Sequence, residues 1–347
     1  MKGKGAQFNP NNPFFKYSSG QVHIEGIDED TSVENPGVQL FYDSPQNVIS
    51  KNKSQDVPFE YSINPYQGCE HGCVYCYARN SHTYWGFSPG LDFESKIVVK
   101  KNVAEKLEAN LSGPNWKVNT LMLSGNTDCY QPIEKKLKLT RSILELALKY
   151  RNPVGIITKN SLVLRDLDIL NKLANLSLVH VYFSINTLNE ELRRNMEPRT
   201  ASSNKKLEAI NTLTKAGVPV GVLCAPVIPG LNHHEIPEVL RLSSAAGAVS
   251  AAYTVVRLNG QLDAIFSDWI KKCYPDRAKK VLNQISELHD GHLNDSEWKR
   301  RMIGGGNIAN IIQQLFKHSK SKYFEGRAMP ALNQSIFRRG GNYNLFE

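Results

Sequence analysis

The stretch that decides the fold runs from Tyr61 to Arg79 and reads Tyr-Ser-Ile-Asn-Pro-Tyr-Gln-Gly-Cys-Glu-His-Gly-Cys-Val-Tyr-Cys-Tyr-Ala-Arg. It holds three cysteines in one short loop: Cys69, Cys73 and Cys76. Thiolates are soft ligands, and three so close together can bind one metal centre if the backbone turns tightly. Gly68 and Gly72 come directly before the first two cysteines, where a tight loop needs permissive backbone angles.

Two kinds of metal centre fit three clustered cysteines. A closed structural zinc site takes four ligands, usually as two pairs, and the remaining cysteines (Cys129, Cys224 and Cys273) are isolated in the sequence. A [4Fe–4S] cluster normally takes four cysteines, so three leave one iron open to a ligand that is not protein. We interpret His71, between two of the cysteines, as an exposed loop histidine rather than a fourth ligand. The pattern therefore favours the cluster, with zinc as the alternative.

Composition indicates a globular enzyme-sized chain. Its 347 residues are 41% hydrophobic, which suffices for a core, and barrel-like α/β folds reach this length as one unit. No run of eighteen apolar residues is present, and no apolar segment follows the charged N-terminus, so we expect neither a membrane span nor a signal peptide. Six cysteines in so long a chain do not make a disulfide framework, and a thiolate-held cluster suits a reducing compartment. We therefore predict a cytoplasmic location.

The net charge of +9 is compatible with nucleic-acid binding. The basic residues are scattered, with small groups at Lys135-Lys136, Lys279-Lys280 and Lys299-Arg-Arg301. Solvated helix faces explain such groups equally well. Charge alone leaves both interpretations open.

The chain beyond the leader alternates between strand-like and helix-like segments. Residues 1–58 are rich in Asn, Pro, Gly and Ser and are predicted to be an extended leader, with edge strands at 22–24 and 37–42. The predicted strands are residues 62–64, 119–124, 153–158, 178–184, 219–226 and 251–256. The predicted helices between them are residues 103–110, 132–150, 164–174, 204–216 and 234–246. This spacing is typical of β-α units with a parallel sheet.

Six such units predict an α/β fold, a partial (β/α)6 TIM-like barrel over residues 59–257. The carboxyl ends of its strands share one rim, because parallel crossovers are right-handed. Residues 258–347 are predicted to form a helical extension, with helices at 263–273, 276–289, 296–302 and 307–317, followed by a tail. We expect this part to cover the open side of the barrel.

The spacing Cys-x3-Cys-x2-Cys, with an aromatic residue just before the last cysteine, resembles the radical S-adenosylmethionine (SAM) superfamily, whose core is also a partial barrel. The resemblance implies that the open iron of a [4Fe–4S] cluster on Cys69, Cys73 and Cys76 chelates SAM. It also implies that the reduced cluster cleaves SAM to methionine and a 5′-deoxyadenosyl radical, with electrons from a cellular reductant such as flavodoxin or ferredoxin.

The same resemblance assigns cofactor contacts to successive strand ends. After the second strand, superfamily members have a small Gly-containing segment that holds the methionine amino group, here Ser124, Gly125, Asn126 and Thr127. Lys159, after the third strand, can pair with the SAM carboxylate, and Ser184 and Asn186, after the fourth, can bond the ribose. Arg199, in Glu197-Pro-Arg199, can clamp a carboxylate at two points. Asp128 can cap a helix or contact the cofactor.

A narrower resemblance points to the spore photoproduct lyase-like group and its uncharacterised bacterial relatives. It extends from about residue 5 to the final helices and is carried by the segments at 62–73, 90–94, 125–128, 130–132, 158–159, 165–168, 197–199 and 225–230. Tyr77 matches an aromatic position at which a hydrogen atom can be relayed, although packing against the cluster is the plainer role. At the position of the lyase's hydrogen-donating cysteine this chain has Met122, and Cys129 is the candidate replacement.

These observations predict a radical SAM enzyme that abstracts a hydrogen atom from a substrate the sequence does not name. Kinship and charge raise a nucleic acid as substrate, for lesion repair or modification. Chemistry on a peptide is less supported, because no second cysteine group is present for an extra cluster. The alternative is a non-catalytic iron-sulfur or zinc protein that binds nucleic acid or a protein partner.

Overall fold

The structure is a computed structural model of the chain, and it describes residues 3–14 and 37–340. Its centre is a seven-stranded sheet in the order β10-β9-β8-β7-β6-β3-β2. Six of the strands are parallel neighbours: β3 (Tyr61–Ile63), β6 (Leu121–Leu123), β7 (Val154–Thr158), β8 (Val179–Ser184), β9 (Val220–Val227) and β10 (Ser250–Val255). They overlap the six strands that the sequence predicts, so the α/β fold is confirmed. Among the described residues, β10 and β2 are the two edges of this sheet, so the barrel stays open.

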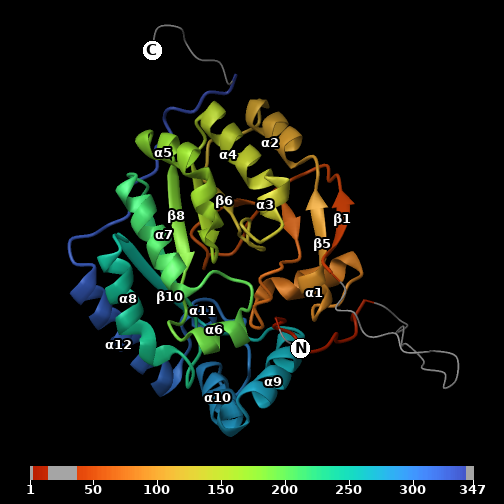
Figure 1. The fold of residues 1–347 in the computed structure, drawn as a ribbon, viewed down its shortest axis with the longest axis vertical. Coiled ribbons are helices and arrows are strands. Elements are labelled where there is room, and N and C mark those ends of the chain that lie inside the picture. Colours follow the sequence, from red (N-terminus) through yellow and green to blue (C-terminus); the bar gives the residue numbers. More distant parts are fainter. Residues whose placement is uncertain (1–2, 15–36, 341–347) are drawn as a thin grey trace, which may run out of the picture.

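The helices between these strands pack outside the sheet (Figure 1). They are α2 (Val103–Ser112), α4 (Leu139–Tyr150), α5 (Leu167–Asn175), α7 (Ser203–Lys215) and α8 (Ile236–Ala245). Each buries an apolar stripe; in α4 the buried side chains include Ile143, Leu144 and Ala147. Together with the strands they form one main hydrophobic core.

The long helix predicted over residues 132–150 is broken, and this prediction was wrong. The chain forms α3 (Glu134–Leu137), turns at Lys138 with a φ of 55°, and continues as α4. The two pieces have different buried partners: Glu134 binds Tyr66 and Arg165, whereas the Thr140 hydroxyl donates to the Cys129 carbonyl at 2.6 Å. A straight helix would not direct both groups to these partners.

Other helix ends also differ from the prediction. The segments before α5 and α8 are short 3₁₀ helices, η2 (Ser161–Asp166) and η3 (His233–Glu235). The predicted helix at 296–302 shortens to α11 (Arg300–Ile303), because residues just before it bend to meet Asp56. The pattern missed α6 (Glu190–Met196), α1 (Asp92–Ser95) and the 3₁₀ helix η1 (Tyr77–Trp85).

A second, three-stranded sheet was also missed. It has the order β1-β5-β4, with β1 (Gln39–Asp43) parallel to β5 (Lys96–Lys100) and β4 (Tyr66–Gln67) antiparallel to it. The predicted edge strand at 37–42 corresponds to β1, and β2 (Ile49–Lys51) is a further edge strand of the large sheet. The strand predicted at 22–24 lies outside the described residues.

The C-terminal helices lie at one end and one side of the barrel (Figure 1). Helices α9 (Leu262–Cys273) and α10 (Pro275–Leu288) lie at the end toward which β8 points, and α12 (Gly306–Tyr323) lies beside α8. Beyond α12 the tail crosses the amino ends of the strands: the Asn333 amide donates to the Ser177 carbonyl at 2.8 Å, and the Arg338 amide to the Tyr150 carbonyl at 2.9 Å. The tail therefore covers the rim opposite the cysteine loop.

The open side of the sheet is bridged by polar contacts. Arg301 in α11 binds Asp56 and Ser54, which lie in the loop between β2 and β3, and the Lys299 amide donates to Asp56 at 3.0 Å. The extension thus lies across the open side, as expected. The boundaries at residues 58 and 257 remain predictions. No helix in the described parts of the chain combines the length and apolar character needed to cross a membrane.

Candidate active site

The cysteine loop follows β4 and leads into η1, at the carboxyl-end rim of the sheet. Gly68 and Gly72 both have positive φ, 82° and 69°, as the sequence predicts for a tight loop. At Gly72 a Cβ atom would lie only 2.6 Å from a carboxylate oxygen of Glu94, so the loop folds directly onto that side chain. The three thiols are free and line one cavity of about 1600 Å³.

A buried ion pair between Arg79 and Glu94 supports the cysteine loop. Arg79 donates to the Cys73 carbonyl at 2.8 Å, to the Gly72 carbonyl at 3.0 Å and to Glu94 at 2.6 Å. Glu94 also accepts the backbone amide of Ala6 at 2.7 Å, so the leader is part of the support. Both side chains of the pair are 0–1% exposed. The loop shape is therefore fixed before any cofactor binds.

His71 is buried, so its interpretation as an exposed loop histidine was wrong. Its Nδ1 lies 3.3 Å from a carboxylate oxygen of Asp128, and its Nε2 lies 3.3 Å from the amide nitrogen of Asn160. Asp128 also accepts the Thr158 hydroxyl at 2.9 Å and the Lys159 amide at 2.8 Å. Although burial opposes it, His71 and these hydrogen bonds hold the pKa of Asp128 below its usual range. Asp128 ties the cysteine loop to the end of β7, and α3 has no side-chain cap.

The Gly-containing segment after β6 lies along the cavity as predicted. Ser124 has a φ of 66° and its hydroxyl accepts the Cys129 amide at 2.8 Å. A Cβ atom at Gly125 would lie 2.9 Å from the Cβ of Ser62, so only glycine fits there. The Asn126 amide donates to Asn64 at 3.0 Å, and the Thr127 hydroxyl donates to a backbone carbonyl at 2.6 Å. All four residues line the cavity, but part of their hydrogen-bonding capacity is used within the protein.

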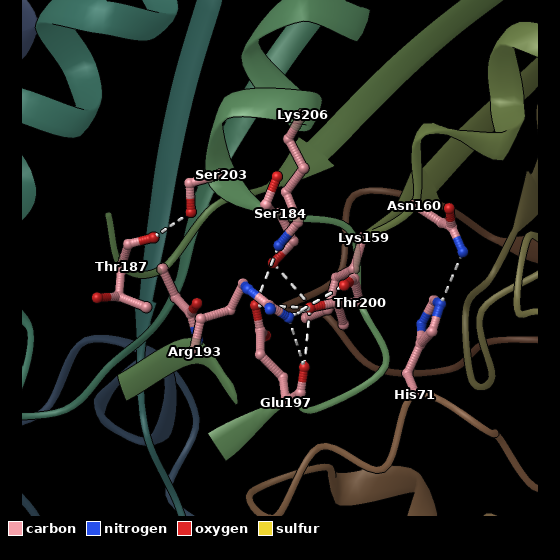
Figure 2. Close-up of polar contacts among 12 residues, drawn as sticks. His71, Lys159, Asn160, Ser184, Thr187, Arg193, Glu197, Thr200, Ser203 and Lys206 are labelled. Atoms are coloured by element: carbon pink, nitrogen blue, oxygen red, sulfur yellow. Dashed lines mark hydrogen bonds and ion pairs between the residues drawn. The ribbon is translucent and has the colours of Figure 1, made fainter. Parts of the chain in front are cut away.

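A second group of polar side chains lies near the ends of β7 and β8, where Lys159 and Ser184 line the cavity (Figure 2). The Lys159 ammonium donates to the Ser184 hydroxyl at 2.9 Å. Tyr75 donates to Glu197 at 2.5 Å, and Glu197 pairs with Lys206 at 3.0 Å. Burial opposes protonation of Lys159, but the negative charges of a Cys73 thiolate and of the Glu197 carboxylate raise its pKa. Lys159 is thus held as a cation beside the cysteines.

Of the other predicted site residues, Tyr77 lies at the cavity, whereas Asn186 and Arg199 do not. Tyr77 lines the cavity and its hydroxyl donates to the Gly125 carbonyl at 2.6 Å. Asn186 lies behind the cavity wall, where it donates to the Tyr75 hydroxyl at 3.0 Å. Arg199 is half-buried outside the cavity lining, and its amide donates to the His71 carbonyl. The structure does not bring these last two to the cavity.

Cys129 lies in the main core rather than at the cavity. It is fully buried and absent from the cavity lining, and burial raises the pKa of its thiol. Met122, at the position of the lyase's donor thiol, does line the cavity. In this structure the thiol of Cys129 therefore does not reach the space in which Met122 lies.

The sequence missed the side chains that hold the site together. The sequence analysis quoted segments that contain Arg79, Glu94 and Glu197, but it assigned none of them to the buried ion pairs Arg79–Glu94 and Glu197–Lys206. Arg257, after β10, also lines the cavity and was used only as a boundary. Its signal was its place at a strand end, where barrel folds put functional groups.

The residues present fit an iron-sulfur cluster with a SAM neighbour. Three free thiols, a buried cation, a hydroxyl and a glycine cradle meet in one cavity. Burial raises the pKa of the Cys69, Cys73 and Cys76 thiols, and a coordinating metal reverses this by deprotonating them. Within residues 3–14 and 37–340, no three His, Cys, Asp or Glu side chains converge on a single-ion site. A cubane cluster is larger than one ion, so its thiolates need not converge on one point.

Comparisons with known proteins agree with this geometry. The profile of the radical SAM superfamily matches residues 63–243. An uncharacterized protein of Mycobacterium tuberculosis is 35% identical over 226 residues, which span 65% of this chain. They span 66% of that protein, so the match covers just under two thirds of its length. An uncharacterized protein of Methanocaldococcus jannaschii is 29% identical over 228 residues, 65% of this chain and 81% of that protein.

More distant similarities concern proteins whose activity is known from their names. A radical SAM Nα-GlyT isomerase of Pseudomonas phage M6 is 23% identical over 232 residues, 65% of this chain and 46% of the isomerase. The fold resembles spore photoproduct lyase complexed with dinucleoside spore photoproduct, with a TM-score of 0.61, 17% identity and coverage of 88% of this chain and 86% of that one. A lyase variant with bound AdoMet superposes with the same TM-score of 0.61.

Proposed function

We propose that this chain, which belongs to the radical SAM superfamily, binds its [4Fe–4S] cluster through Cys69, Cys73 and Cys76 and uses SAM to abstract a hydrogen atom from a substrate. Members of the superfamily use this cluster together with SAM. The observation that carries the proposal is that the three thiols share one cavity with Lys159, Ser184 and the Ser124-Gly125 turn. A cluster ligated by three thiolates and a cation beside it are what a chelating amino acid cofactor needs.

Each side chain has a defined task in this proposal. Lys159 pairs with the SAM carboxylate, and the backbone around Ser124 and Gly125 approaches its amino group closely. When bound and reduced, the cluster supplies one electron to SAM, which breaks to methionine and a 5′-deoxyadenosyl radical. Tyr77, on the cavity surface, is placed to contact that radical or the substrate. Asn186 acts indirectly, by orienting Tyr75.

A nucleic acid or nucleotide is the substrate that we favour. The lyase whose fold this chain shares is complexed with a dinucleoside photoproduct, and the net charge is +9. The basic groups contribute unequally: Arg300 and Arg301 are engaged by Asp295 and Asp56, whereas Lys279 and Lys280 are exposed on α10. The reductant is a small electron-transfer protein such as flavodoxin or ferredoxin, and thiolate ligands suit the reducing cytoplasm.

The rival function is a non-catalytic iron-sulfur or zinc protein. It predicts a fourth protein ligand and no affinity for SAM. His71 is the nearest candidate in sequence, but its two ring nitrogens are engaged by Asp128 and Asn160. The structure thus favours three protein ligands and an open position.

Anaerobic reconstitution with iron and sulfide, followed by reduction in the presence of SAM, tests the proposal. We expect 5′-deoxyadenosine and methionine from the wild type and only background from Cys73→Ala, because an incomplete ligand set does not hold the cluster. Cys224→Ala is the matched control, since it removes a buried cysteine of β9 outside the cavity lining. Tightly held zinc, or a cluster that neither binds nor cleaves SAM, contradicts the proposal.

A further inference from the structure

The cavity continues past Tyr77 to a wall that the cofactor assignment does not use. This wall is formed by the end of β10, the loop between β2 and β3, and α11. Arg257 follows β10 directly, so it lies at the carboxyl-end rim that carries the cysteine loop. Its side chain is half-buried and lines the cavity.

Arg257 has no direct partner in the described parts of the chain. Among the residues that the structure describes, no hydrogen bond or ion pair joins its guanidinium to another side chain or to the backbone. Asp56 is the acid that acts on it electrostatically, but Asp56 is already bound by Arg301 and by the Lys299 amide. Burial and the charge of Arg301 lower the pKa of Arg257. A half-buried cation under repulsion is stabilised when a ligand brings an anion.

The position of Arg257 connects it to the reaction centre. Arg257, Tyr77 and Cys76 line the same cavity, and Tyr77 follows Cys76 directly in the chain. A substrate held by Arg257 therefore shares the cavity with the three thiols.

The remaining lining favours a planar, aromatic ligand next to that anion. Aromatic side chains line the same cavity, among them Phe59, Tyr77 and Tyr182. Nucleobases stack on such rings, and the guanidinium fork matches phosphate geometry. A volume of about 1600 Å³ exceeds the range of about 300–1,000 Å³ for one drug-sized ligand, so it has room for SAM and a second molecule.

We propose that Arg257 binds a phosphate group of the substrate, and that the substrate is a nucleotide, either free or within a nucleic-acid strand. This inference rests on the proposed function, because it places the nucleotide beside SAM in the same cavity. It is separable by experiment, since SAM cleavage and phosphate selectivity are measured independently.

The test compares a charged probe with an uncharged one. The reconstituted enzyme with SAM bound is titrated with three probes: thymidylyl-thymidine, its neutral methylphosphonate analogue and thymidine 5′-monophosphate. The probes carry thymine because an adenine probe would compete with the adenosyl group of SAM. We expect the wild type to bind the charged dinucleotide at least about tenfold more tightly than the neutral one, as one charged hydrogen-bonded contact provides. Binding of the dinucleotide but not the monophosphate assigns a strand as the source, and binding of both assigns free nucleotides.

Variants of Arg257 then locate the selectivity. Arg257→Gln should bring the ratio of the two affinities close to one, and Arg257→Lys should keep part of it, because lysine retains the charge without the fork. The ratio is an internal control for misfolding, which weakens both probes together. Lys172→Gln, an exposed cation of α5 outside the cavity lining, should leave the ratio unchanged. A ratio in Arg257→Gln equal to that of the wild type overturns the anion site while SAM cleavage stands. A wild type that does not bind SAM overturns the proposed function and this inference with it.

Discussion

The charged side chains on two walls of one cavity differ in whether they have partners within the protein. The cysteine wall is the part of the lining formed by the cysteine loop and Lys159. Its charged side chains, and those of Arg79 and Glu197 behind it, have close partners inside the protein. In the substrate wall, formed by residues 52–60, Arg257 and α11, Arg257 has no partner among the described residues, and the pair Arg301–Asp56 is only partly buried. The charges of the first wall are paired within the protein, whereas the second wall leaves one charge for a ligand to neutralise.

The difference teaches which ligand each wall serves. A site for an invariant cofactor gains from side chains locked in advance by packing and hydrogen bonds. A site for a charged substrate gains selectivity when the substrate supplies the missing partner, because a ligand without that charge leaves the guanidinium unpaired. The following predictions test this contrast, from the largest expected effect to the smallest.

The largest effect should come from the support of the cysteine wall. Glu94→Gln leaves the guanidinium of Arg79 buried and without its counter-charge, so we expect a loss of about 3–5 kcal/mol in the free energy of unfolding. Urea unfolding of the anaerobic protein measures it. The matched control is Glu238→Gln, whose partner Arg241 is 48% exposed, so the free energy of unfolding should barely change. Equal effects in the two variants would show that the buried pair is not a special support.

A smaller effect should appear in SAM affinity. Lys159→Gln removes the cation assigned to the SAM carboxylate, and loss of one charge-assisted hydrogen bond of about 1.5–3 kcal/mol raises the SAM dissociation constant about 10- to 150-fold. Equilibrium dialysis with the reconstituted variant measures this constant, and iron content shows whether the cluster is retained. Lys172→Gln, an exposed lysine of α5, is the control. An unchanged constant in Lys159→Gln would remove Lys159 from the SAM site.

The smallest effect should come from the contacts of Asp56 with Lys299 and Arg301 in the substrate wall. Although burial opposes it, the Lys299 amide and the Arg301 guanidinium hold the pKa of Asp56 below its usual value. A depressed carboxyl pKa contributes stability that is present above the unfolded value of about 3.9 and is lost as the pH falls through the folded value. In the cluster-free protein, Asp56→Asn should speed backbone hydrogen exchange in residues 52–58 at neutral pH, and its difference from the wild type should vanish in acid. A difference that is independent of pH would exclude the carboxylate as the cause.

The sequence predicted the parts of this molecule that depend on local pattern. The buried β-branched runs gave the parallel strands, and the cysteine spacing with Gly68 and Gly72 gave the loop. Strand β5 was missed because its apolar run is short and its position depends on pairing with β1 and β4, which lie far away in the chain. The break at Lys138 was missed for a similar reason, since it follows from the partners of Glu134 and Thr140.

The candidate site divides along the same line. The side chains at strand ends, such as Lys159 and Ser184, were predicted because topology brings the carboxyl ends of parallel strands together. Long-range contacts, such as the hydrogen bond from Tyr75 to Glu197, are not encoded in any local spacing. The burial of His71 depends on Asp128 in the same way. The sequence places Arg257 at a strand end, but only the structure shows that it has no partner among the described residues.

The account's central claim is that three cysteines hold a cluster whose open iron binds SAM. The electron paramagnetic resonance spectrum of the reconstituted, reduced protein tests it most directly when it is recorded without and with SAM. We predict the signal of a reduced [4Fe–4S] cluster whose g values shift on addition of SAM, in the wild type and in Cys224→Ala, and no such signal in Cys73→Ala. A cluster signal that SAM leaves unchanged would show that no iron is open to it, and it would contradict the claim.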